Sequence, residues 1–112
     1  MDFETYRVRM MADDPTILSM HDMGDGHCLI VARLLFHWTV RRSEIGNFDS
    51  YIERWCYAAP LLAEASIIEW RSRGFEGEPL GWHKHPDTGR VRPNGDPSKE
   101  HKERENPSWL LD

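Results

Sequence analysis

The sequence predicts an α+β fold: a small antiparallel β-sheet covered by one main α-helix, with an extended Pro/Gly-rich C-terminal arm. Three observations favour it. Residues 27–42 form the most apolar stretch and alternate in their second half, residues 51–57 alternate again, and residues 60–73 are rich in helix formers. A chain of 112 residues is long enough to bury one core without a metal or a disulfide. We therefore expect a compact domain over residues 1–73 and a partly disordered arm over residues 74–112.

The N-terminal segment predicts two strands. Residues 3–10 alternate apolar and polar side chains, which favours a half-buried strand, although a helix fits this segment nearly as well. Residues 16–21 are expected to form a second strand that folds back on the central stretch, because the Asp-Gly sequence within residues 24–26 is a hairpin signal. A short helix that begins at Asp14, with Pro15 in its first turn, is the alternative for this second segment.

The central apolar stretch exceeds the usual length of a strand. We favour one bent strand over residues 28–42, and the alternative is a helix that continues as a strand. Residues 34–40 and 51–57 both carry aromatic side chains, and cross-strand aromatic contacts contribute roughly 0.2–1 kcal/mol each, so these two segments are expected to pair. His37 is interpreted as a hydrogen-bonded core residue rather than a general base, since no nucleophile motif accompanies it.

The helix predicted over residues 60–73 has start and stop signals. Pro60 suits the first helical position, Arg71 and Arg73 lie near the negative end of the helix dipole, and Gly74 follows. Its apolar residues form a wide face that we expect to cover one face of the sheet. These residues are Leu61, Ala63, Ala65, Ile67, Ile68 and Trp70.

Composition limits the classes of partner. The formal net charge is −5, and the acidic excess lies in the first seventy residues, which argues against a broad cationic face for nucleic acid. Cys28 and Cys56 lie in apolar segments, and the N-terminus carries no signal-like sequence, so we expect a reducing, cytoplasmic setting, in a host cell if the chain is phage-encoded. The apolar runs are too short for a membrane helix, so no membrane partner is expected.

The arm is the expected place of function. It is too polar to fold alone yet carries tryptophan, which favours a non-enzymatic protein-interaction module that reaches another protein or a second copy of itself. The predicted partner-binding residues are Trp82, His83, His85, Arg90, Arg92 and Trp109. The second hypothesis is a nucleic-acid-associated protein, in which Lys84, Arg90 and Arg92 contact phosphate while Trp82 stacks on a base.

A metal-binding protein or an enzyme is the third hypothesis. His83 and His85 are spaced to share a metal from an extended segment. The loop at residues 21–27 gathers further weak metal candidates, which are His21, Asp22, Asp25 and His27. An ordered surface loop and a polar hairpin turn explain the two segments better, so we expect no metal, no cofactor and no catalytic residue.

Over roughly residues 16–97 the chain resembles small uncharacterised proteins of proteobacterial phages and mobile elements. The resemblance lies in residues 54–57, in the Ala-rich helix that ends at Trp70, and in residues 81–90. It implies no fold, no activity and no site residue. It does imply a context, since small acidic proteins of this kind often act by binding, as virion components or as inhibitors of host nucleases and defence complexes.

Overall fold

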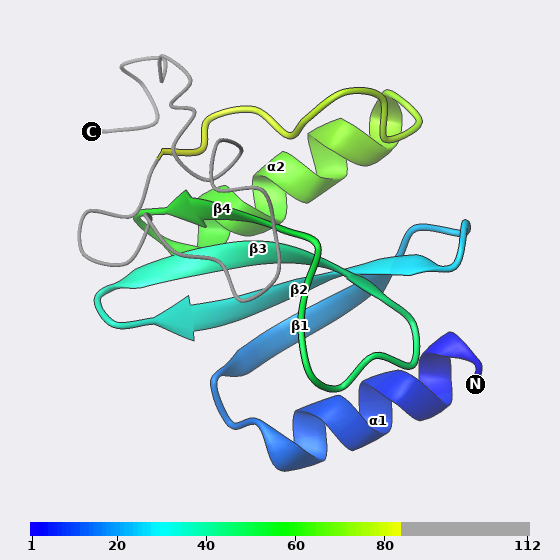
Figure 1. Cartoon of the computed structure of the whole chain (residues 1–112). Helices are drawn as coiled ribbons and strands as arrows, with labels where there is room; N and C mark the ends of the chain where they lie inside the picture. The colour runs from blue at the N-terminus through cyan, green and yellow to red at the C-terminus, as the bar shows by residue number, and fades with distance from the viewer. Residues whose placement is uncertain (84–112) are drawn as a thin grey trace.

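The computed structural model describes residues 1–83, which form a four-stranded sheet between two helices (Figure 1). Each strand pairs antiparallel with the next strand in sequence, in the order β1-β2-β3-β4. One helix lies against each face of the sheet. The predicted α+β class with an antiparallel sheet is therefore confirmed. The elements are α1 (Phe3–Asp13), β1 (Ile17–Asp22), β2 (His27–Leu34), β3 (His37–Glu44), β4 (Glu53–Tyr57) and α2 (Pro60–Ser72).

The strand predicted over residues 3–10 is wrong, because this segment is helix α1. Asp2 caps the helix, its side chain accepting a hydrogen bond of 2.8 Å from the backbone N–H of Thr5. Phe3, Tyr6 and Met10 follow the helical spacing and pack on one face of the sheet. Over so short a segment the apolar residues fit both periods, and burial of Tyr6 in the helical arrangement decides between them.

The single bent strand predicted over residues 28–42 is also wrong. The stretch forms two strands, β2 and β3, joined by a two-residue turn at Leu35 and Phe36. Leu35 has a φ of 55°, a left-handed conformation that costs a leucine roughly 1–2 kcal/mol. Phe36 is 84% exposed. Neither residue type signals a turn, so the sequence pattern runs through this corner without a break.

Three predicted elements are confirmed. β1 folds back on β2 through a turn in which Gly24 and Gly26 have φ values of 86° and 88°. The second aromatic segment contains β4, which pairs with β3 and sets Trp38 opposite Tyr57. The predicted helix over residues 60–73 is α2, with Pro60 in its first turn.

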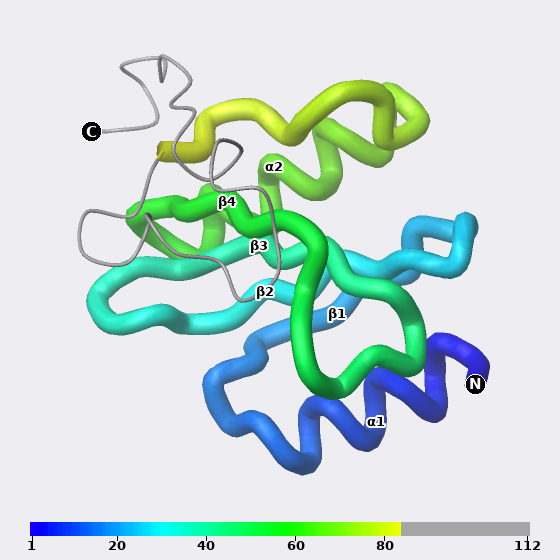
Figure 2. The backbone as a smooth tube through the Cα atoms, viewed as in Figure 1, coloured from blue at the N-terminus to red at the C-terminus, as the bar shows by residue number. Residues whose placement is uncertain are grey.

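Residues 74–83 belong to the compact body, although they were predicted to begin the arm. After α2 the chain turns back at Gly74 and runs along the helix to the outer side of β4, as the yellow tube in Figure 2 shows. There His83 pairs with Cys56, and its backbone N–H donates a 2.9 Å hydrogen bond to the Cys56 carbonyl. Trp82 is only 1% exposed and packs in the same core cluster as Trp55 and Trp70.

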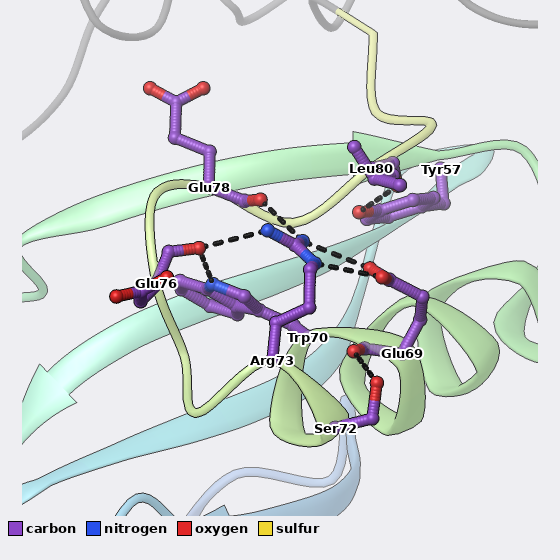
Figure 3. A network of polar contacts seen from close by, with 8 residues as sticks. All are labelled: Tyr57, Glu69, Trp70, Ser72, Arg73, Glu76, Glu78 and Leu80. Carbon is purple, nitrogen blue, oxygen red and sulfur yellow. Dashed lines mark hydrogen bonds and ion pairs between the residues drawn. The ribbon is translucent and has the colours of Figure 1, made fainter.

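Arg73 fastens this returning segment to α2 (Figure 3). Its guanidinium donates to the Glu69 carboxylate at 2.7 and 2.9 Å and to the carbonyls of Glu76 and Glu78 at 3.0 and 2.9 Å. The Trp70 indole N–H donates to the same Glu76 carbonyl at 3.0 Å. The Arg73 contacts with backbone carbonyls define the path of residues 76–78 independently of their side chains.

Candidate interaction surface on helix α2

Helix α2 has two opposite apolar faces, and the sheet covers one of them. Ala63, Ile67 and Trp70 are buried against the sheet. Leu61 and Ile68, by contrast, are 80% and 68% exposed. The prediction that all the apolar residues of this helix cover the sheet is therefore wrong for Leu61, Ala65 and Ile68, which are exposed. A single sheet contacts only one side of a helix, and residues seven apart on the far side remain in solvent.

The exposed face forms a straight line along the helix, here called the outer strip. Its members are Leu61, Ala65, Ile68 and Ser72, all exposed and separated by four, three and four residues. Residues at these spacings stack one above another on a helix. The returning segment does not cover them, because it binds the flank of α2 that carries Glu69 and Arg73 (Figure 3).

Charged residues line both sides of the outer strip. Glu69 and Arg73 form the ion pair on one flank, and the hydrogen bond from Arg73 to Glu69 is the main cause that raises the pKa of Arg73. Glu64 and Arg71 lie on the other flank. The Arg71 guanidinium carbon is 5.8 Å from the centre of the Phe75 ring. An apolar line with a charged rim is the usual composition of a protein-interaction surface.

A polar cluster ties α2 to β1. The Ser19 hydroxyl donates to both Glu64 carboxylate oxygens at 3.0 Å, and His21 Nε2 lies 2.9 Å from Glu64 Oε1 and 3.1 Å from Ser19 Oγ. A catalytic relay needs the histidine to contact the acid and the nucleophile through different ring nitrogens. Here one nitrogen contacts both, and the serine proton points to the carboxylate. These contacts therefore fit a structural role, in which they link β1 to α2 and fix the position of the Glu64 carboxylate.

A cavity of about 230 Å³ opens on the other face of the sheet, between α1 and the loop at residues 45–52. Arg41 lines the cavity, and burial lowers the pKa of its guanidinium. The Asp14 carboxylate opposes this shift, with Asp14 Oδ2 3.8 Å from Arg41 Nη2. Asp49 joins Asp14 in the lining, so carboxylates offset the cationic charge. The lining also contains apolar side chains such as Ile30 and Phe48, and it has no excess of cationic charge that would select an anion.

The structure describes two of the predicted partner-binding residues, Trp82 and His83, and both belong to the compact body. Trp82, predicted to bind a partner, is a buried residue of the core cluster. His83 pairs with β4, and its ring lies 5.3 Å from that of His37. The remaining predicted arm residues, namely Lys84, His85, Arg90, Arg92 and Trp109, lie outside the described residues.

The two aspartates among the metal candidates of the β1–β2 turn accept hydrogen bonds from backbone N–H groups. Asp22 accepts from the Gly24 N–H at 2.9 Å, and Asp25 accepts from the His27 N–H at 3.0 Å. His21 points instead to Glu64. Within residues 1–83 no three His, Cys, Asp or Glu side chains converge as they would around a metal ion.

No described helix is long and apolar enough to cross a membrane. Comparison of the chain with protein-family models, with curated proteins and with solved structures gave no match.

The sequence analysis identifies Leu61, Ala65 and Ile68 of the outer strip as apolar but assigns them to the face that covers the sheet. Two residues of the sequence could have distinguished the two faces of α2. Ser66 is small and lies on the buried face, where its hydroxyl donates to the Ala63 carbonyl at 2.7 Å. Glu64 is charged and lies at the edge of that face. A helix with apolar residues on two opposite sides, separated by charged flanks, has more apolar surface than one sheet can cover.

Proposed function

We propose that this chain is a non-enzymatic protein-interaction module that docks a protein on the outer strip of α2. The observation that carries the proposal is the exposure of Leu61 and Ile68 on the face of α2 that points away from the sheet. Full burial of one such side chain is favourable by about 1.5–3 kcal/mol. Exposure of two such side chains along one line of the helix therefore favours association along that line.

The shape of the surface supports a helix or strand as the docked element. Ala65 lies between the two large residues and presents little volume, so a partner backbone can approach closely there. The ion pair between Glu69 and Arg73 borders the apolar line and keeps its edge polar. Scattered single exposed hydrophobic residues are ordinary on protein surfaces, whereas an apolar line with a polar border is typical of contact sites.

The proposal is tested by photo-crosslinking in the native host. A photoreactive phenylalanine analogue placed at residue 68 is expected to capture one defined protein, and Leu61→Glu in the same chain is expected to abolish that adduct. Position 8 supplies the matched control, because Val8 is 55% exposed but belongs to α1 on the other face of the sheet. Circular dichroism verifies that each variant keeps its fold.

Two outcomes would overturn the proposal. One is the same set of adducts from positions 68 and 8, which would indicate random collision. The other is an adduct at position 68 that survives Leu61→Glu in a folded chain, because contact along the strip requires both residues.

A further inference from the structure

We propose that the outer strip docks the outer strip of a second copy of this chain, with the two α2 helices antiparallel about a twofold axis. This inference rests on the proposed function and names the partner for the same surface. A twofold contact needs a patch that is complementary to itself in shape and in charge. The outer strip meets both conditions.

The spacing of residues along the outer strip makes it complementary to itself in shape. Separations of four, three and four residues along Leu61, Ala65, Ile68 and Ser72 are those of a two-helix seam, in which side chains of one helix fit between those of the other. With the helices antiparallel and the axis between residues 65 and 68, Ala65 of each copy faces Ile68 of the other. A small side chain thus meets a large one twice, and Leu61 meets Ser72 at each end.

The flanking charges select the direction. On the flank opposite the returning segment, Glu64 and Arg71 are seven residues apart. The antiparallel arrangement that sets residue 65 against residue 68 also sets Glu64 of each copy against Arg71 of the other. A parallel arrangement would instead bring Glu64 of one copy toward Glu69 of the other, which repels.

Intrachain contacts hold one of these charges in place. Ser19 and His21 fix the Glu64 carboxylate on the flank of α2, and its side chain keeps 30% of its surface exposed. The Arg71 guanidinium lies beside Phe75 at the other end of the helix. Each copy contributes only two large apolar side chains, so the contact belongs to the small, weak class of protein interfaces and is expected to dissociate in the micromolar range or above.

Disulfide trapping of the full chain tests both the partner and the direction. Chains carrying Ala65→Cys and chains carrying Ile68→Cys are mixed under mild oxidation. The antiparallel seam is expected to give mostly the mixed disulfide, at least several-fold above either homotypic product. The native Cys28 and Cys56 are buried, and burial raises the pKa of Cys28 to about 12, so the native thiols stay out of the reaction. Val8→Cys is the control for random collision, since Val8 lies on the other helix.

Homotypic products in excess would overturn the antiparallel direction, and yields no higher than those of Val8→Cys would overturn self-association. Sedimentation velocity over a concentration series gives an independent readout. Arg71→Glu is expected to weaken dimer formation at least several-fold, and Glu64→Lys combined with Arg71→Glu is expected to restore part of it. If the chain stays monomeric while position 68 still crosslinks a different protein in a Leu61-dependent manner, this inference fails and the proposed function stands. If both experiments are negative, both fail.

Discussion

Arg41 and Arg54 lie directly opposite each other on β3 and β4, and each guanidinium carbon is 5.9 Å from the centre of the same Tyr51 ring. Like charges in this position destabilise a sheet. The electron-rich face of an aromatic ring attracts a nearby cation, by about 0.5–1 kcal/mol at exposed sites. Tyr51 therefore offsets a repulsion that the pairing of β3 with β4 creates.

Removing the ring tests this relationship. Tyr51→Ala is expected to lower the free energy of unfolding by about 1–2 kcal/mol, because two cation–ring contacts are lost. Tyr51→Phe keeps the ring and should cost much less. Urea unfolding followed by tryptophan fluorescence measures both. Equal losses from the two variants would show that the hydroxyl group, and not the ring, carries the effect.

The two faces of α2 should respond differently to substitution. Ile67→Ala is expected to lower the free energy of unfolding by about 2–4 kcal/mol, because Ile67 is buried in the core cluster. Leu61→Ser on the outer strip should change it by less than about 0.5 kcal/mol. Urea unfolding at low protein concentration measures both changes in the free energy of unfolding. A large loss from Leu61→Ser would mean that the residue packs within its own chain.

Trp82 is expected to be required for full stability. Trp82→Ala should cost about 3–5 kcal/mol, since an almost completely buried indole is deleted, and Trp82→Phe should cost less. The Tyr57 hydroxyl, which donates to the Leu80 carbonyl at 3.0 Å, ties the same segment to β4. Thermal unfolding of the full chain compares the stability of the two variants. An unchanged midpoint for Trp82→Ala would place residues 74–83 outside the cooperative unit.

Stability should fall in strong alkali. Burial is the main cause that raises the pKa of Tyr6 to about 12, above its usual value near 10, and burial likewise raises the pKa of Cys28 to about 12. The folded chain therefore retains protons that the unfolded chain releases. The stabilisation is complete below about pH 8, under the unfolded pKa of both groups, and is lost as pH rises towards 12, with a slope of about 1.4 kcal/mol per pH unit for each group between its unfolded and folded pKa.

Urea unfolding at a series of pH values measures this slope. Tyr6→Phe should make the curve shallower between pH 10 and 12. The same variant removes the hydrogen bond from the Tyr6 hydroxyl to the Asn47 carbonyl, so it should also lower stability at neutral pH by about 1 kcal/mol. A slope that Tyr6→Phe leaves unchanged would assign the alkaline loss to other groups.

The first hairpin and α2 are predicted correctly because the sequence carries local signals at their boundaries. Gly24 and Gly26 mark the first hairpin, and Pro60 and Gly74 bracket α2. The second hairpin turns at Leu35 and Phe36, and neither residue is a turn signal. Pairing of β2 with β3 holds Leu35 in its left-handed conformation, and this pairing cannot be recognised from the local sequence.

Function-related residues were harder to predict, because their environment depends on tertiary contacts. Trp82 lies in a segment whose composition indicates an arm, and its packing in the core cluster is a tertiary contact that the local sequence does not show. Leu61 and Ile68 were recognised as apolar, but the sequence does not show how much of the helix circumference the sheet covers.

The order of the strands has a kinetic consequence. Because β1, β2, β3 and β4 pair only with their neighbours in sequence, the sheet grows by closing one hairpin after another, and each step joins segments that are already near in the chain. Low sequence separation between contacting residues is associated with fast folding. Contacts far apart in sequence join β1 to α2, as between Ser19 and Glu64, and α1 to the loop at residues 45–52, as between Tyr6 and Asn47. Because these contacts close long loops, we expect them to form after the hairpins.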